Sequence, residues 1–450
     1  MKVVKFGGSS VANGEQFKKV LHIVGADPSR KIIIVSAPGK RSSDDTKTTD
    51  LLIALSKSVE GNSYDEEALA RVVNRYAEIV RDLSLSESLI DSIEDNLKQT
   101  ISKLHNNENR LLDALKASGE NNNAKLLAAY LQSSGHEASY VSPKEAGLIV
   151  TDEPGDAKVL PQSYEKLASL KERSGKLVIP GFFGYSHEGN IVTFPRGGSD
   201  ITGSIIAAGV HATEYENFTD VDCIYSVNPS IVENPHPVKE LTYQEMRELS
   251  YAGFSVFHDE ALQPAFEKGV PVRVKNTNNP DLPGTRIVAK RQLTGQSVVG
   301  IASDEGFCSL NVAKYLMNRE IGFGRKLLRI LEEEYISYEH TPSGIDNMSV
   351  IIRSNQLENG KEERIIERIR TELEVDEVDI EHDLAMIMVV GEGMNDMVGI
   401  AAKAATALAD VGVNIKMINQ GSSEVSVMFG VKADDVTKAV RSLYNMFFKK

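Results

Sequence analysis

Residues 5–10, KFGGSS, place a lysine, two glycines and two serines at the end of a short apolar segment. The backbone N–H groups around Gly7 and Gly8 can form a concave nest for an anion, and a helix beginning near Ser10 would direct its positive end to the same place. Lys5 adds a mobile positive charge. The lysine precedes the glycines, so the segment is not a P-loop. A plain glycine turn remains the alternative.

A second glycine-rich segment, residues 194–209, reads FPRGGSDITGSIIAAG. The guanidinium of Arg196 has the planar fork that binds a carboxylate through two hydrogen bonds. The glycines let the backbone approach a ligand closely. In the alternative interpretation, Ser199 or Asp200 simply caps a helix after a tight turn.

Three further polar positions have two interpretations each. Asp220 and Asp222 follow an apolar run and either hold Mg²⁺ together with phosphate oxygens or belong to a turn. Glu120 follows a glycine at an expected helix start, where it either meets a ligand or stabilises the helix dipole. Thr49 lies in the polar start of another expected helix, where it either caps the helix or touches a ligand.

The elements that position these residues alternate along residues 1–296. Short Val- and Ile-rich runs end in turn residues and are separated by stretches of helical length, with an entirely helical block at 62–118. Near-continuous apolar strands between helices predict a largely parallel sheet covered on both faces. The sequence does not decide whether the helical block is a lid or a scaffold.

The last third of the chain contains a repeat. A shift of 77 residues aligns Lys326 with Lys403 and Leu331 with Leu408. Each copy has the order of a βαββαβ unit of the ferredoxin-like kind. We expect an extra strand at 297–303 before the first copy, and a linker that ends at residue 296.

Composition narrows the classes of function. The chain has 450 residues, and 50 Lys and Arg against 64 Asp and Glu give a net charge of −14, which argues against a nucleic-acid partner. Two cysteines exclude a disulfide framework and a cysteine-based zinc site. No apolar run reaches the ~18 residues needed to span a bilayer, and no signal pattern opens the chain, so we expect no membrane partner and a cytoplasmic protein.

Together, the motifs KFGGSSVA, TTDLL, SGE, PRGGSD and TDVD, followed by the tandem repeats, resemble aspartokinase over essentially the whole chain. The resemblance implies a three-layer αβα amino-acid-kinase domain over residues 1–296 and ferredoxin-like ACT domains over 297–380 and 381–450. It also implies the reaction of ATP with L-aspartate to give 4-phospho-L-aspartate and ADP. An ionised carboxylate needs no general base, so catalysis is expected to rest on positioning and charge neutralisation.

The resemblance also assigns roles to residues. Lys5 would neutralise the transferring phosphoryl group, and Asp200 would orient Lys5. Arg196 would hold the aspartate α-carboxylate, and Glu120 would meet its α-ammonium. The rest of the substrate pocket would comprise Ser36, Thr49 and Ser199. The ATP side would comprise Lys5, Gly7, Gly8, Ser9, Thr219, Asp220, Asp222 and Tyr225, with Mg²⁺ bound mainly through the ATP phosphates and no dedicated metal site.

Three positions depart from the family pattern on the ATP side: Cys223 replaces a glycine, Ser230 an arginine and Ser255 a lysine. Two other functions therefore stay open. One is another kinase of the same fold that acts on glutamate, acetylglutamate or a nucleotide. The other is an amino-acid sensor without turnover.

The first repeat matches the region where the family binds its inhibitor. The expected effector contacts are Met317, Phe323, Gly324, Tyr338, Glu339 and Ser343, with Glu339 meeting an ammonium group. The alternative is that these are core and loop residues of a structural repeat. The resemblance favours lysine over threonine as the effector and implies at least a homodimer through the ACT domains.

Overall fold

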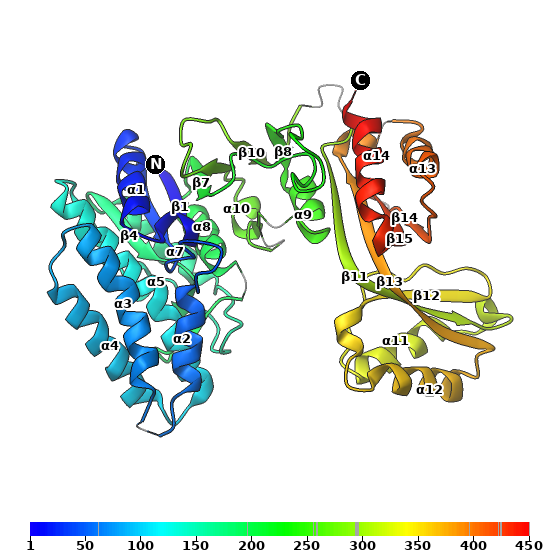
Figure 1. Ribbon diagram of the computed structural model, residues 1–450, viewed down its shortest axis with the longest axis horizontal. Helices are drawn as coiled ribbons and strands as arrows, with labels where there is room; N and C mark the ends of the chain where they lie inside the picture. The colour runs from blue at the N-terminus through cyan, green and yellow to red at the C-terminus, as the bar shows by residue number, and fades with distance from the viewer. Residues whose placement is uncertain are drawn as a thin grey trace. The chain divides into compact units, whose positions relative to one another are not determined.

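The computed structural model forms two compact units (Figure 1). The first comprises Met1–Ile224, Pro237–Met246 and Val256–Arg291, and the second Tyr225–His236, Arg247–Ser255 and Gln292–Lys450. The structure describes residues 1–61, 63–195, 197–254, 256–257, 260–292, 297–395, 397–421, 423 and 425–449.

The first unit is built on an eight-stranded sheet with the order β3-β4-β2-β1-β7-β9-β10-β8. Neighbouring strands are parallel except β9 and β10, which confirms the predicted, mainly parallel sheet. A small hairpin, β5 (Phe183–Tyr185) and β6 (Ile191–Thr193), stands apart from it. The strands of the main sheet are β1 (Lys2–Phe6), β2 (Arg30–Val35), β3 (Ala138–Tyr140), β4 (Lys176–Pro180), β7 (Glu214–Thr219), β8 (Glu240–Thr242), β9 (Val272–Asn276) and β10 (Thr285–Val288).

Helices cover both faces of this sheet and give the three-layer αβα arrangement (Figure 1). On one face, Val4, Phe6, Ile33 and Val35 pack in a core with side chains from five helices. These are α1 (Gly14–Ala26), α2 (Thr48–Lys57), α3 (Glu66–Asp82), α4 (Ser88–Leu104) and α5 (Glu108–Ser133). On the other face α8 (Gly198–Gly209) lies against β1, β2 and β7, and it contacts α7 (Gln162–Leu167) and α10 (Gln263–Glu267).

The second unit contains a five-stranded antiparallel sheet with the order β12-β11-β13-β15-β14. Two of its strands, β11 (Gly300–Ala313) and β13 (Glu377–Val390), are long and pair with each other. The shorter strands are β12 (Asn347–Arg353), β14 (Met417–Asn419) and β15 (Ser426–Lys432). The helices of the two copies are α11 (Phe323–Glu333), α12 (Lys361–Leu373), α13 (Ile400–Asp410) and α14 (Val436–Phe448).

The long strands are shared between two cores. Residues 307–313 of β11 pair with β12 and with the first half of β13, whereas residues 300–305 pair with 385–390 of β13. The extra strand expected at 297–303 therefore contributes to the sheet region of the second copy, where β13 separates it from β15. The predicted boundary between residues 380 and 381 lies inside β13. Periodicity could not reveal this sharing, because a strand that continues from one core to the next has no break in its sequence.

Part of the region predicted as the catalytic domain belongs to the second unit. Val227 and Val232 are buried in the same core as α13 and α14. The helix α9 (Tyr243–Tyr251) begins in the first unit and ends in the second. Residues 293–296, at the predicted domain boundary, lie outside the described residues, so that boundary stays a prediction.

Candidate active site

The predicted site lies where five parallel strands end. Strands β1, β2, β4, β7 and β9 run in one direction, so the loops after them meet at one edge of the sheet, where open α/β sheets bind ligands. Backbone hydrogen bonds join these loops: Gly7 N–H donates to Phe218 O at 3.0 Å, and Gly181 N–H donates to Val35 O at 3.0 Å. Ser36 N–H, after β2, donates to Phe6 O of β1 at 3.2 Å, so the loops after β1, β2 and β4 are connected to one another and to the end of β7.

The loop after β2 rests on the glycine pair of KFGGSS. Gly39 N–H donates to Gly8 O at 2.9 Å. A Cβ atom on Gly39 would lie 2.5 Å from Gly8 C, so only glycine allows this approach. The element after Gly8 is a single 3₁₀ turn, Gly8–Val11, and α1 begins only at Gly14 with Asn13 as its cap. The helix expected to begin near Ser10 therefore begins four residues later, at Gly14, because Asn13 caps its first turn.

Lys5 and Asp200 form the central contact of the site. Lys5 is 7% exposed, and its Nζ lies 2.7 Å from Asp200 Oδ1. Asn217 is the register partner of Lys5 on β7 and donates its side-chain N–H to the same carboxylate oxygen. Two donors therefore fix Asp200, and Asp200 fixes the ammonium group of Lys5. Asn217 was not predicted, because no motif marks it. It faces the same side of the sheet as Lys5 because the two residues are register partners on neighbouring parallel strands.

The start of α8 answers the question of capping. Its N-cap is Gly197, with φ of 76°, and no side chain caps the helix. Capping by Ser199 or Asp200 is therefore wrong, because Asp200 is turned toward Lys5. A Cβ atom on Gly181 would lie 2.8 Å from Ser199 Oγ, which places Ser199 beside the loop after β4. Arg196 lies outside the described residues.

Glu120 lies in the middle of α5, so its interpretation as a charge at a helix start is wrong. The side chain is 6% exposed, and its Oε2 atom has no hydrogen-bond partner among the described residues. Burial raises the pKa of Glu120 to about 8, against the opposing effects of Ala37 N–H and of the charges on Lys116 and Lys5. A buried carboxyl group with an unpaired oxygen points to a ligand that completes its bonding.

Two neighbouring polar groups share this feature. Thr48 Oγ1 and Asn123 Oδ1 are buried and have no hydrogen-bond partner among the described residues. Thr48 and the half-buried Thr49 both lie in the first turn of α2, whose N-cap Lys47 makes no side-chain cap, so capping by Thr49 is wrong. Asn123, one helical turn after Glu120, was also not predicted. Its i, i+3 spacing placed it on the same face of α5 and could have identified it.

The expected nucleotide side is only partly brought together. Thr219 ends β7, and its hydroxyl donates to Asp220 Oδ1 at 3.1 Å. Asp222 Oδ1 accepts hydrogen bonds from the side-chain amides of Asn276 at 2.7 Å and Asn279 at 2.9 Å. Asp222 therefore fastens the loop after β7 to the loop after β9. Tyr225 belongs to the second unit, so its role beside the nucleotide stays a prediction.

The expected effector residues differ in burial. Met317 and Phe323 are part of the core around α11, Gly324 is half-buried on the same helix, and Tyr338 and Ser343 are exposed. Glu339 accepts a hydrogen bond from Tyr251 Oη, and Arg353 Nε lies 3.6 Å from its carboxylate. Glu339 thus already has two partners within the second unit.

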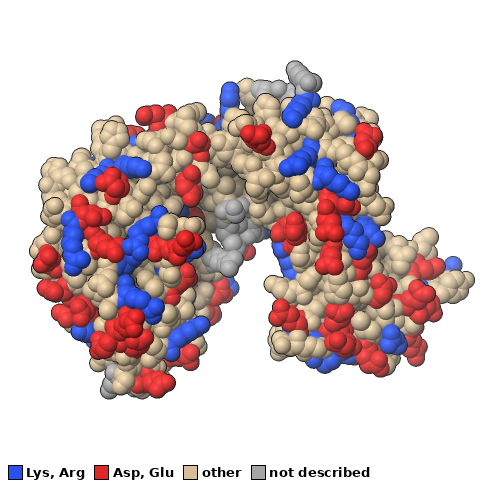
Figure 2. All heavy atoms as spheres, viewed as in Figure 1, with Lys and Arg blue, Asp and Glu red and all other residues tan. Residues whose placement is uncertain are grey.

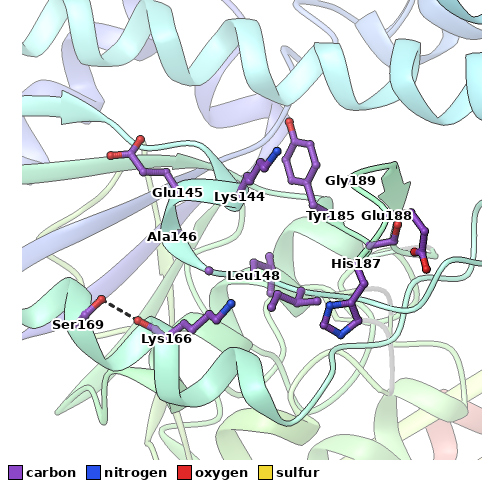
Figure 3. Close-up of a pocket in the computed structure, with 13 residues that line it drawn as sticks. Lys144, Glu145, Ala146, Leu148, Lys166, Ser169, Tyr185, His187, Glu188 and Gly189 are labelled. Carbon is purple, nitrogen blue, oxygen red and sulfur yellow. Dashed lines mark hydrogen bonds between the residues drawn. The ribbon is translucent and has the colours of Figure 1, made fainter.

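A hollow of about 630 Å³ lies elsewhere in the first unit (Figure 3). Its walls include α6 (Pro143–Ala146), the 3₁₀ turn η2 (Ala168–Lys171) and the loop after β5, and none of the predicted site residues lines it. Both signs of charge surround it, from Lys144 and Lys166 and from Glu145 and Glu188.

Three further observations concern surface charge, metal ligands and the hydropathy of the helices. Acidic and basic side chains are interspersed over the visible face of each unit (Figure 2). Within the described ranges, no three His, Cys, Asp or Glu side chains are placed to hold a metal ion. Of the helices that the structure describes, none is both long and apolar enough to cross a bilayer.

Comparison with known proteins decides the family. The profile of the amino acid kinase family matches residues 1–276, and an ACT domain profile matches residues 387–447. Aspartokinase 3 of Bacillus subtilis (strain 168) is 59% identical over 448 residues, covering 100% of this chain and 99% of that protein. The chain belongs to the aspartokinase family. It is therefore a phosphotransferase with a carboxyl group as acceptor.

Solved aspartokinase structures confirm the fold. Aspartate kinase of Clostridium acetobutylicum superimposes with a TM-score of 0.89 at 41% identity, covering 99% of this chain and 100% of that one. Aspartokinase III of E. coli, solved in complex with aspartate and ADP, superimposes with a TM-score of 0.81 at 24% identity, covering 100% of each chain. The predicted αβα kinase domain with ferredoxin-like ACT domains is thus confirmed for this aspartokinase.

Proposed function

We propose that this aspartokinase transfers the γ-phosphate of ATP to the β-carboxylate of L-aspartate, giving 4-phospho-L-aspartate and ADP. This is the first step of lysine, threonine and methionine biosynthesis. The observation that carries the proposal is the pairing of Lys5 with Asp200 beside a glycine nest and a buried, incompletely bonded Glu120. One edge of the sheet thereby offers positive charge for phosphate and negative charge for an amino group.

The chemistry needs charge neutralisation more than proton transfer. The attacking β-carboxylate is ionised at neutral pH, and two anions must approach each other. Lys5 Nζ, held by Asp200, supplies a fixed positive charge for the transferring phosphoryl group, and the N–H groups of Gly8 and Ser9 donate to phosphate oxygens. Gly7 N–H is bonded to Phe218 O, so Gly7 contributes by leaving space beside Lys5 Nζ, which would lie 3.4 Å from a Cβ atom there. Asp200 acts by orienting Lys5 and is not a base.

Recognition of the amino acid uses the opposite side of the same edge. Glu120 pairs with the α-ammonium group of aspartate, which gives its Oε2 atom a hydrogen-bond donor. Ser36, Thr49 and Ser199 complete the pocket. Arg196 binds the α-carboxylate through two hydrogen bonds.

The nucleotide side uses Thr219, Asp220 and Asp222, with Tyr225 as a further contact. Asp220 is exposed, and its carboxylate oxygens are ligands that suit hydrated Mg²⁺. Asp222, in contrast, accepts hydrogen bonds from two asparagine amides. Mg²⁺, when bound with ATP, neutralises phosphate charge and is held mainly by the phosphates. The chain's own contribution is to hold the loops after β7 and β9 together.

Trapping of the product as a hydroxamate tests this function. The enzyme, MgATP and hydroxylamine are incubated separately with aspartate, glutamate and N-acetylglutamate. Hydroxamate from aspartate alone is expected. N-acetylglutamate lacks the free ammonium group that Glu120 requires, and the extra methylene group of glutamate moves its side-chain carboxylate away from the position of the aspartate β-carboxylate. Hydroxamate from glutamate or N-acetylglutamate alone would favour another kinase of this fold, and none from any substrate would favour an amino-acid sensor.

We further propose that the ACT domains mediate feedback inhibition and that lysine, rather than threonine, is the effector. The enzyme is proposed to be a cytoplasmic protein that forms at least a homodimer. The effector contacts are Met317, Phe323, Gly324, Tyr338, Glu339 and Ser343. Support comes from the position and charge of Glu339, a half-buried carboxylate in the segment after α11, because an ammonium group requires a negative partner. Titration of turnover with lysine and threonine separately, together with the mass in solution, tests this proposal.

A further inference from the structure

The helical segment 62–118 contributes two neighbouring side chains to the loops of the site. On α3, Arg75 is 3% exposed, and its Nη2 donates to Gly39 O. The next residue, Tyr76, is fully buried and donates its hydroxyl to Gly119 O at 2.9 Å, one residue before Glu120. The segment therefore holds, through these two hydrogen bonds, the backbone at Gly39 and next to Glu120.

Burial of the Arg75 guanidinium is energetically unfavourable, because the group is charged and only partly hydrogen-bonded. Its Nη2 atom lies 3.1 Å from Asp45 Oδ2, yet its Nε and Nη1 atoms are buried with no hydrogen-bond acceptor among the described residues. Burial, followed by the charge of Arg41, lowers the pKa of Arg75. An apolar side chain of similar size would avoid the cost of burying an incompletely paired cation, so packing alone does not account for arginine here.

The carbonyl that Arg75 holds belongs to the residue that contacts the glycine nest. Gly39 N–H donates to Gly8 O at 2.9 Å, so Gly39 is bonded to Arg75 on one side and to Gly8 on the other. Glycine is the residue with the greatest backbone freedom, and Gly39 has no side chain of its own to fix its orientation. The two hydrogen bonds supply the orientation that the residue itself does not.

The amino-acid side of the same loop has a separate anchor. Asn123 Nδ2 donates to Ser36 O at 2.7 Å, three residues before Gly39. Ser36 N–H also donates to Phe6 O at 3.2 Å, which ties this part of the loop to β1. Loss of the contact at Gly39 would therefore leave Ser36 in place.

We propose that Arg75 is a positioning residue for the nucleotide half of the site, where it holds Gly39 against Gly8 and so sets the shape of the phosphate nest. The inference rests on the proposed function, in which the nest receives the phosphates of ATP. Arg75 touches neither substrate. The helical segment is accordingly a scaffold of the site. Arg75 positions Gly39 on the nucleotide side, whereas Asn123, which lies beyond the segment on α5, positions Ser36 on the amino-acid side.

Steady-state kinetics of Arg75→Met, Arg75→Lys and a control test this proposal. We expect Arg75→Met to raise the KM for MgATP about tenfold, the size of effect given by loss of a charge-assisted hydrogen bond that positions a binding loop. The KM for aspartate should change less than twofold. Arg75→Lys keeps a cationic donor and should lie closer to wild type. Arg71→Gln, an exposed arginine one turn earlier on α3, should match wild type.

Calorimetric titration with ADP gives a readout that does not depend on turnover. Weaker ADP binding in Arg75→Met with an unchanged melting temperature supports the inference. An unchanged KM and an unchanged affinity for ADP, or an equal rise in KM for both substrates, would overturn it. If Arg75→Met does not fold, Asp45→Asn, which weakens the hold on Arg75, should raise the KM for MgATP about threefold, and no rise would overturn the inference.

Failure of the proposed function gives a different result. If the wild-type enzyme forms no acyl phosphate from aspartate, the proposed function is wrong. The ADP titration would still show whether Arg75 shapes the nest.

Discussion

Binding of aspartate is expected to release a proton from Glu120. Burial raises the pKa of this carboxyl group to about 8, so at pH 7 about nine-tenths of the free enzyme carries the proton. A bound α-ammonium group favours the ionised carboxylate and lowers its pKa. Each aspartate bound should therefore release about 0.9 proton at pH 7 and about 0.2 at pH 8.5. The apparent affinity for aspartate should rise about eightfold over the same interval, since the competing proton is lost.

Isothermal titration in buffers of different ionisation enthalpy measures this proton release directly. Glu120→Gln is the matched variant, because it keeps the shape and cannot ionise; its binding should be weaker and independent of buffer. Its stability gives the second control. The folded pKa lies above the ordinary 4.5, so the wild-type fold loses stability as pH rises from about 4.5 to about 8, and the variant should not. Buffer-independent binding by the wild type at pH 7 would refute the reasoning.

Three further expectations concern single residues. Lys5→Met should lower kcat about 10²–10³-fold with the fold retained, since Asn217 still bonds to Asp200; steady-state turnover measures it, and an unchanged kcat would remove Lys5 from catalysis. Gly39→Ala should cost about 1–3 kcal/mol in denaturant unfolding, because its Cβ meets backbone atoms; equal stability would contradict the close contact. Glu339→Gln should weaken inhibition by lysine or threonine about tenfold or more at unchanged kcat, and full sensitivity to both would exclude it from the effector site.

The fold of the kinase region followed from the sequence because its signals are local. Runs such as residues 32–35 are apolar on both faces, and only a strand covered on both sides of a parallel sheet buries them so completely. The repeat in the last third was also visible. The sharing of β11 and β13 between two cores was not, because pairing partners such as Ile301 and Val389 lie far apart in sequence. Nor did the sequence show that residues 225–236 pack with the second unit.

The site was predictable where motifs carry it and less so where packing does. Lys5 and Asp200 lie in glycine-rich segments, and the structure brings them into contact. The surroundings of Glu120 required the fold, because its burial arises from helices that pack around the middle of α5. Asn217 and Arg75 carry no motif. Their importance lies in long-range contacts with Asp200 and Gly39, which single-sequence periodicity does not encode.

Trapping with borohydride tests the central claim, because it reports which carboxyl group receives the phosphate. Borohydride reduces an acyl phosphate to the corresponding alcohol and leaves a free carboxylate intact. With MgATP and aspartate, transfer to the β-carboxylate predicts homoserine, and parallel incubations with glutamate should give no alcohol. Formation of 3-amino-4-hydroxybutanoate would place the phosphate on the α-carboxylate. That result, or the absence of any alcohol derived from aspartate, would contradict the account.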